Sequence, residues 1–112
     1  MGTLFTKIIN KEIPADIIYE DELSLVFKDI NPQAPTHLLI IPKKPIPKLS
    51  DATESDKDLL GHLMWVAGEI ARDLELDETF RLVTNNGAKA GQSVFHLHLH
   101  LLSGRPLQWP PG

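Results

Sequence analysis

The 112-residue sequence contains no cysteine, which excludes a disulfide framework, thiolate catalysis and any metal site built on thiolates. No stretch approaches the roughly 20 apolar residues of a membrane span, and the first residues lack the pattern of a signal peptide. Basic residues form no stripe and the net charge is -4, so little in the chain attracts duplex nucleic acid. We therefore expect a cytoplasmic protein that binds neither membranes nor duplex nucleic acid.

The composition is that of an ordinary globular protein, with 42% hydrophobic and 23% charged residues. A chain of this length fits one domain that buries roughly two thirds of its unfolded surface. The sequence has no internal repeat, no low-complexity tract and no long linker. We therefore expect residues 1–112 to form a single domain.

The pattern of apolar residues predicts one short helix, one long helix and several short strands. Thr3 is suited to cap a short helix over residues 3–10, and apolar residues at 3.6-residue spacing predict a long helix over 55–74. Most connections between the strands are as short as hairpin loops, which favours an α+β fold on an antiparallel sheet. The predicted strands are residues 17–19, 23–28, 37–41, 79–84 and 96–102.

The last of these strands reads His-Leu-His-Leu-His-Leu-Leu. Side chains alternate between the two faces of a strand, so His96, His98 and His100 are expected on one face and the leucines on the core face. Imidazole titrates near neutral pH. Three aligned histidines therefore offer nucleophiles, general acids or metal ligands.

Three interpretations of this strand are open from the residues alone. In the first, the histidines are ordinary polar side chains of the sheet, either on its surface or satisfied in its core, although solvent-facing positions usually mix residue types. In the second, two of them bind a metal ion together with His37, but the outer rings of the strand are about 13 Å apart and cannot easily share one ion. In the third, a neutral imidazole attacks phosphorus and water then releases the phospho-imidazole.

The loop before the histidines favours the third interpretation. Gly87 and Gly91 allow backbone N–H groups to approach a phosphate closely, and Asn85 and Ser93 add side-chain donors. Such a loop is by itself usually no more than a turn. Its position directly before the aligned histidines predicts a phosphate-binding loop.

Together these residues resemble the histidine-triad (HIT) family of nucleotide-binding proteins. The resemblance covers the pattern Asn-x-Gly-x-x-x-Gly-Gln-Ser-Val-x-His-x-His-x-His over residues 85–100, and the segments 13–15, 29–37 and 104–105. The closing Trp-Pro-Pro-Gly of residues 109–112 looks like the Hint branch, whose members hydrolyse purine nucleoside phosphoramidates.

The resemblance implies a role for each histidine that matches the family. His98 matches the nucleophile that forms a nucleotidyl-histidine intermediate, and His100 matches the residue that contacts the α-phosphate. His96 and His37 match a relay that positions and polarises the nucleophile. Ser93 matches a donor near the leaving group.

The resemblance also implies a nucleotide-binding site. Asp29 matches the carboxylate whose two oxygens accept hydrogen bonds from the ribose hydroxyls. Asn85 matches a phosphate ligand, and Gly91 and Gln92 belong to the same loop. Apolar residues that could otherwise be plain core fall where the family builds its purine slot: Phe5, Ile8, Ile13, Phe27, Ile30 and Leu39.

We therefore expect a hydrolase that cleaves the P–N bond of adenosine 5′-phosphoramidate-like substrates and releases AMP, with aminoacyl-adenylates as further candidate substrates. The nucleotide ligand would be AMP or GMP, and the scheme requires no metal or other cofactor. The alternatives are a dinucleoside polyphosphate hydrolase of the same family, a nucleotide-binding regulatory module with little turnover, and a zinc-binding protein.

Members of the Hint branch are homodimers whose sheet continues across the interface and whose C-terminal residues approach the partner's site. In this chain Trp65, Val66 and Trp109 are apolar side chains without an obvious place in a small core. We therefore expect a homodimer with Trp109 near the partner's site. Lys89 adds a positive charge to the phosphate loop, and His62, outside any motif, is expected to face solvent or an interface.

Overall fold

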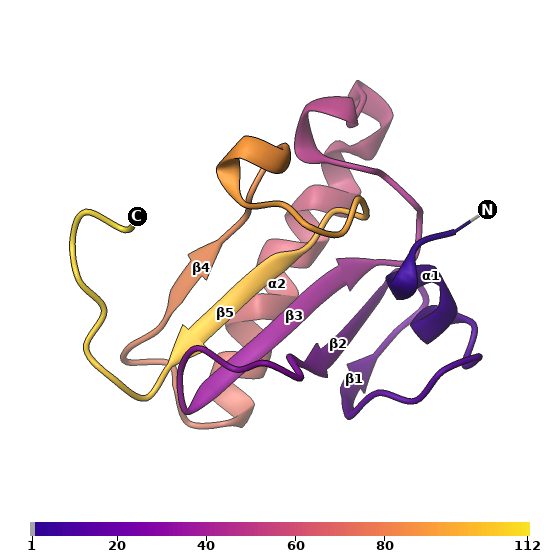
Figure 1. Ribbon diagram of the computed structural model, residues 1–112. Helices are drawn as coiled ribbons and strands as arrows, with labels where there is room; N and C mark the ends of the chain where they lie inside the picture. The colour runs from indigo at the N-terminus through magenta and orange to yellow at the C-terminus, as the bar shows by residue number, and fades with distance from the viewer. Residues whose placement is uncertain (1) are drawn as a thin grey trace.

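A five-stranded antiparallel sheet forms the centre of the computed structural model, which describes residues 2–112. The long helix α2 crosses behind the sheet in Figure 1. The predicted α+β fold, with one long and one short helix, is confirmed. In the order in which they lie side by side, the strands are β1 (Ile17–Glu20), β2 (Ser24–Lys28), β3 (Thr36–Pro42), β5 (Leu99–Ser103) and β4 (Arg81–Val83).

The short helix α1 (Leu4–Ile9) begins at the predicted cap. Thr3 Oγ1 accepts hydrogen bonds from the N–H groups of Phe5 and Thr6, and the Thr3 N–H donates to Thr6 Oγ1 at 3.2 Å. This reciprocal pair satisfies N–H groups that the first helical turn leaves without partners. Phe5 and Ile8 are buried and pack with side chains of β2 and β3, on the opposite face of the sheet from α2.

Helix α2 (Lys57–Asp73) follows two 3-10 turns, η1 (Leu49–Asp51) and η2 (Glu54–Asp56). The expectation that Val66 lies outside the core is wrong, because Val66 belongs to the buried stripe and has no exposed surface. Trp65 next to it is 55% exposed. The stripe that packs against the sheet has the i, i+3, i+4, i+7 spacing of an amphipathic helix and consists of Leu63, Val66, Ala67, Ile70 and Ala71.

The strand of the histidines is shorter than predicted. β5 begins at Leu99, so His96 and His98 lie in the segment before it. This segment is hydrogen-bonded to the chain that leaves β3, because the Leu97 N–H donates to the Ile46 oxygen at 2.7 Å. The alternation of faces nevertheless continues across the boundary. The first three leucines of the motif are buried against α2, whereas the last two histidines line a cavity on the other face.

His62 is not a free surface residue. Its Nε2 lies 2.7 Å from Asp21 Oδ2, which joins α2 to the turn between β1 and β2. Burial acts to raise the pKa of Asp21, but hydrogen bonds from Tyr19, His62 and the Leu23 N–H hold that pKa well below its usual range. The ionised carboxylate therefore connects the helix to the sheet edge.

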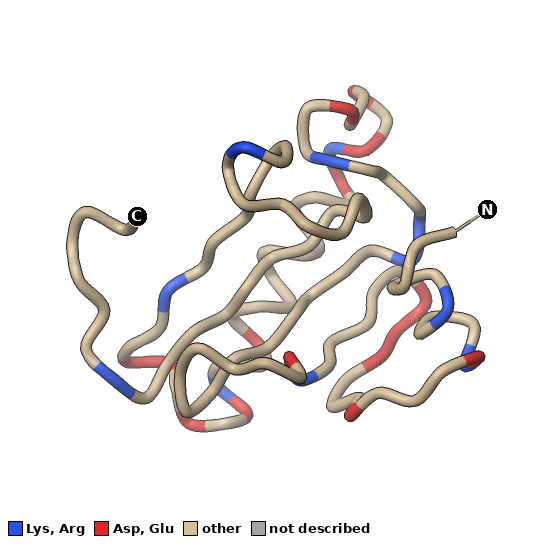
Figure 2. The backbone as a smooth tube through the Cα atoms, viewed as in Figure 1, with Lys and Arg blue, Asp and Glu red and all other residues tan. Residues whose placement is uncertain are grey.

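Charged side chains are dispersed, and Figure 2 shows short blue and red stretches without a continuous basic run. Within residues 2–112, no helix is both long and apolar enough to cross a membrane.

Candidate functional site

A cavity of about 250 Å³ lies between α1, the strands β2 and β3, and the segment before β5. Four polar residues from the sequence-based site line it, namely Asp29, Ser93, His98 and His100. Apolar walls with a few convergent polar groups are typical of small-molecule sites. Binding of a purine there stays a prediction. The cavity is also lined by all six side chains predicted to form the purine slot: Phe5, Ile8, Ile13, Phe27, Ile30 and Leu39.

A second, larger cavity of about 450 Å³ lies at the end of the sheet, where α2 ends. Lys28 and Asp29 line both cavities, and His37 lines the larger one. The larger cavity is not lined by His98 or Ser93. The smaller cavity is therefore the candidate for chemistry at a bound ligand.

The ring of His98 is oriented by the backbone. Its Nδ1 lies 2.8 Å from the carbonyl oxygen of His96. A carbonyl oxygen can only accept, so Nδ1 carries the proton and Nε2 of the neutral ring is unprotonated. The Phe5 ring meets the His98 ring edge to face, with 5.0 Å between centroids. The site therefore holds an imidazole with a free lone pair, as a nucleophile requires.

The ring of His96 is not hydrogen-bonded to His98, although the His96 carbonyl is, because the ring is turned toward the end of β3. Its Nε2 donates to the Pro42 oxygen at 2.7 Å, and its Nδ1 is buried without a hydrogen-bond partner among residues 2–112. Burial lowers the pKa of His96, while the bond to Pro42 acts in the opposite direction. His96 thus contacts the His98 ring through its backbone carbonyl, a contact that the order of side chains does not indicate.

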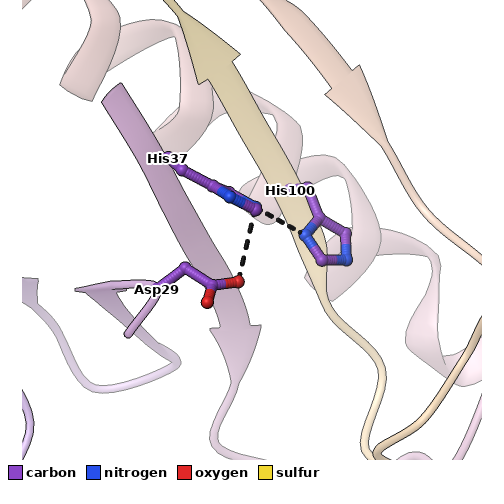
Figure 3. Close-up of side chains that lie close together, drawn as sticks. All are labelled: Asp29, His37 and His100. Atoms are coloured by element: carbon purple, nitrogen blue, oxygen red, sulfur yellow. Dashed lines mark hydrogen bonds and ion pairs between the residues drawn. The ribbon is translucent and has the colours of Figure 1, made fainter. Parts of the chain in front are cut away.

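The side chains of His37, His100 and Asp29 lie close together (Figure 3). Asp29 and His100 line the smaller cavity, and His37 lines the larger one. His37 Nε2 lies 2.9 Å from His100 Nδ1 and 3.4 Å from Asp29 Oδ2. The Gln33 N–H donates to His37 Nδ1 at 3.0 Å, so His37 carries its proton on Nε2 and donates it to His100. His100 in turn carries its proton on Nε2, the atom left free to donate to a ligand.

The rings of His37 and His100 are both neutral near pH 7. Burial lowers the pKa of His37 by more than the Asp29 carboxylate raises it. Burial, with the neighbouring His98 and His37, lowers the pKa of His100 to about 4. The contact between Asp29 and His37 is therefore one between a carboxylate and a neutral ring. His100 offers a neutral N–H donor.

Asp29, His37 and His100 also have the composition of a metal site, with one ligand atom from each within 4.8 Å of the others. Zinc in a catalytic site takes three such protein ligands at about 2.0–2.1 Å, which places two ring nitrogens about 3.3 Å apart. Here His37 Nε2 lies 2.9 Å from His100 Nδ1, with the His37 proton between the two nitrogens. The arrangement therefore fits a hydrogen-bond network better than a metal ion.

Gln92 supports the predicted phosphate loop without lining the cavity. Its Oε1 accepts from the Gly87 N–H at 2.8 Å, and its Nε2 donates to the Pro47 and Val94 oxygens at 2.8 and 3.1 Å. The side chain is 3% exposed. Gln92 therefore fixes the loop to the chain that follows β3.

Asn85 and Gly91 lie together in the same loop, outside the lining of the cavity. A Cβ on Gly91, whose φ is +104°, would lie 3.5 Å from Asn85 Nδ2. Lys89 is exposed on the 3-10 turn η3 (Ala88–Ala90) and does not line the cavity either. Within the loop 85–93, Ser93 is thus the predicted residue that reaches the cavity.

Several neighbours of the site were not predicted from the sequence. Lys28 lines the cavity and directly precedes Asp29, so proximity in sequence could have suggested it. Gln33 acts through its backbone N–H, which no side-chain pattern indicates. Four further residues line the cavity as parts of its wall: Leu4, Pro14, Ala15 and Val94.

Residues 10–107 match the family described as the HIT domain. An uncharacterized HIT-like protein of Synechocystis sp. is 64% identical over 110 residues, which cover 98% of this chain and 96% of that protein. A protein of Zea mays named 14 kDa zinc-binding protein is 51% identical over 112 residues, which cover 98% of this chain and 88% of that protein.

Solved structures give the same result. A HIT family hydrolase from Legionella pneumophila Philadelphia 1 superposes with a TM-score of 0.95 at 50% identity, covering 97% of this chain and 98% of that one. A histidine triad nucleotide-binding protein from Candida albicans superposes with a TM-score of 0.83 at 34% identity, covering 97% and 83%. The resemblance seen in the sequence is confirmed at the level of the family.

Proposed function

This chain belongs to the HIT family, and we propose that it is a hydrolase of the Hint branch that cleaves the P–N bond of purine nucleoside 5′-phosphoramidates. The product would be AMP from an adenosine substrate. The names of the Legionella and Candida relatives, which contain hydrolase and nucleotide-binding, support this class of reaction and ligand.

The observation that carries the proposal is the hydrogen bond from His98 Nδ1 to the His96 carbonyl, which leaves Nε2 unprotonated on a ring that lines the cavity. In the first step Nε2 attacks the α-phosphorus, the P–N bond breaks and the amine leaves with a proton. Ser93, which also lines the cavity, is the proposed donor of that proton. In the second step water attacks phosphorus and the bond between phosphorus and Nε2 breaks, which releases AMP. One proton of the water returns to Ser93, and the oxygen of the water stays on the phosphate.

Hydrogen bonds stabilise the charge in this scheme. His100 Nε2–H is the proposed donor to a non-bridging phosphate oxygen, and His37 keeps that proton in place by donating to His100 Nδ1. Asp29, on the same wall, is the proposed acceptor for the ribose hydroxyls. The scheme requires no metal.

Steady-state rates on two substrates test the reaction class. With EDTA present, we expect faster turnover of adenosine 5′-phosphoramidate than of diadenosine triphosphate, with AMP as the product. The reverse order would assign the chain to dinucleoside polyphosphate hydrolysis. Binding of AMP without turnover of either substrate would assign it to a regulatory module.

The same assay tests the zinc alternative that the name of the maize relative raises. Zinc on Asp29, His37 and His100 would occupy the carboxylate proposed to bind the ribose and would replace the hydrogen bond between His37 Nε2 and His100 Nδ1. We therefore expect EDTA to leave turnover unchanged. Loss of turnover in EDTA and recovery on addition of zinc would replace the metal-free scheme.

We also propose a homodimer in which the sheet continues from β4, a strand at the edge of the sheet. A free strand edge favours pairing with another chain. The C-terminal segment runs beyond this edge in Figure 1, where Arg81 donates to the Leu107 oxygen and Trp109 is 82% exposed. Trp109 would then lie near the partner's cavity. A monomer mass in sedimentation at micromolar concentration would contradict this arrangement.

A further inference from the structure

Arg105 lies outside the candidate cavity, yet a chain of hydrogen bonds connects it to His100. Arg105 Nε donates to the Gln33 oxygen at 2.9 Å. The N–H of Gln33 donates to His37 Nδ1 at 3.0 Å, and His37 Nε2 donates to His100 Nδ1 at 2.9 Å. The turn that follows β5 is thus connected to the ring proposed to contact phosphate.

A second contact holds the same turn against the loop of Gln33. Thr36 pairs with Ser103 where β3 and β5 meet, so the loop before β3 and the turn after β5 lie side by side. Gly104 has a φ of +99°, and a Cβ there would lie 2.8 Å from Pro35 Cβ. The turn therefore packs on the loop as closely as a residue without a side chain allows.

The guanidinium of Arg105 is itself oriented within the turn. Its Nη1 donates to the Pro106 oxygen at 2.9 Å while Nε donates to Gln33. Arginine carries its donors in a planar, fixed geometry, so one bond aligns the other. Arg105 is exposed and lines neither of the two cavities described above, although it lines a third, shallow one of about 420 Å³ beside Ser103 and Pro106. Its contacts are those of a residue that holds the loop rather than a ligand.

We infer that Arg105 is a positioning residue: by holding the Gln33 carbonyl it fixes the backbone on the C-terminal side of Gln33, which keeps the Gln33 N–H on His37 Nδ1 and the protons of His37 and His100 on Nε2. The reason lies in the order of donors and acceptors. If the Gln33 N–H moved away, His37 could carry its proton on Nδ1 and accept at Nε2. His100 would then donate from Nδ1 and present a lone pair, instead of a proton, to an anionic ligand. The expected effect on turnover rests on the proposed function, whereas the effect on the tautomer does not.

The decisive variant is Arg105→Met, which keeps an unbranched apolar stem and removes every donor. Arg105→Lys is the conservative variant, because an ammonium can still donate to the Gln33 oxygen. Arg81→Ala is the matched control, since Arg81 donates to the Leu107 oxygen in the same C-terminal segment and has no hydrogen bond to the Gln33 loop. If Arg105→Met does not fold, Arg105→Gln takes its place, because its shorter side chain places its donor farther from Gln33.

The first readout is the ¹⁵N NMR signature of the histidine ring nitrogens in the full chain without ligand. We expect His100 protonated on Nε2 in the wild type, in Arg105→Lys and in Arg81→Ala, and a mixture of tautomers in Arg105→Met. The second readout is turnover of adenosine 5′-phosphoramidate. We expect kcat to fall about tenfold in Arg105→Met with a smaller change in KM, because misplacement of a group in the site mainly affects the transition state.

An unchanged His100 tautomer in folded Arg105→Met would overturn the inference, whatever the change in kcat. An equal shift of the His100 tautomer in Arg81→Ala would overturn it as well, because the cause would then be general loosening of the C-terminal segment. If the wild type shows no turnover, the proposed function fails while the NMR comparison still decides the role of Arg105.

Discussion

His98 and His100 lie two residues apart and hold their protons on different ring nitrogens. His98 donates from Nδ1 to the His96 carbonyl, whereas His100 accepts at Nδ1 from His37. One ring therefore presents a lone pair at Nε2 and its neighbour presents a proton at Nε2. The proposed nucleophile and the proposed donor to the phosphate are thus both histidines, and the hydrogen-bond partners of each ring set the difference between them.

Asp29→Asn tests whether Asp29 accepts hydrogen bonds from the ribose hydroxyls. The amide keeps Oδ1, which accepts from the Asn31 N–H at 2.8 Å, but it loses the negative charge and one acceptor. We expect AMP binding to weaken by about 1–2 kcal/mol, because hydrogen bonds to a charged group are the stronger kind. Calorimetry with AMP and with 2′,3′-dideoxy-AMP measures this, and only AMP should be affected. An equal loss for both nucleotides would place Asp29 elsewhere in the mechanism.

The buried histidines predict a loss of stability in weak acid. Burial lowers the pKa values of His37, His96 and His100 in the folded protein, that of His100 to about 4. The unfolded chain, with a histidine pKa near 6.5, therefore binds more protons between about pH 4 and 6.5. The stability is fully present above that window and falls as the pH drops through it.

Urea unfolding at pH 7.5 and pH 5 measures this dependence. We expect the free energy of unfolding to be lower at pH 5, by about 2 kcal/mol from His100 alone. His100→Gln should reduce the difference by that share. A free energy of unfolding that is equal at the two pH values would contradict the neutral state of these rings.

Two glycines should respond to alanine in opposite directions. Gly61 lies on the exposed side of α2, and a Cβ there would meet no atom within 4 Å. Gly61→Ala should stabilise the protein by about 0.5–1 kcal/mol, since glycine costs a helix more backbone entropy than alanine. Gly104→Ala should destabilise it by about 1–3 kcal/mol, because of the positive φ and the contact with Pro35. Thermal unfolding measures both effects, as a higher Tm for Gly61→Ala and a lower Tm for Gly104→Ala. Changes in Tm of the same sign would contradict this prediction.

Local patterns were enough to predict much of the fold. The cap at Thr3, the amphipathic period of α2 and the alternating leucines of β5 each follow from short-range rules, and each has its predicted partner or face. The start of β5 was predicted too early, because the pairing of Leu97 with Ile46 depends on where the chain after β3 runs. Pairing between distant segments is not encoded in the alternation itself.

In the candidate site, too, some features were predictable from the sequence and others were not. The cavity brings together Ser93, His98 and His100, which the residues themselves suggested, and Asp29, which only the resemblance to the family implied. The partners of the ring nitrogens were not predictable, because a carbonyl or an amide N–H has the same chemistry in every residue. The bond from Gln33 to His37 is of this kind. Such contacts depend on the backbone geometry, and the amino-acid sequence does not indicate them.

The most direct test of the central claim compares the wild type with His98→Ala on adenosine 5′-phosphoramidate in the presence of EDTA, with AMP binding measured in both by calorimetry. We predict metal-independent turnover in the wild type and a loss of at least about 10³-fold in the variant, because removal of a nucleophile removes the covalent route. AMP binding should be largely retained, since most of the cavity wall is unchanged. Turnover of His98→Ala within about tenfold of the wild type would contradict the nucleophilic role of His98.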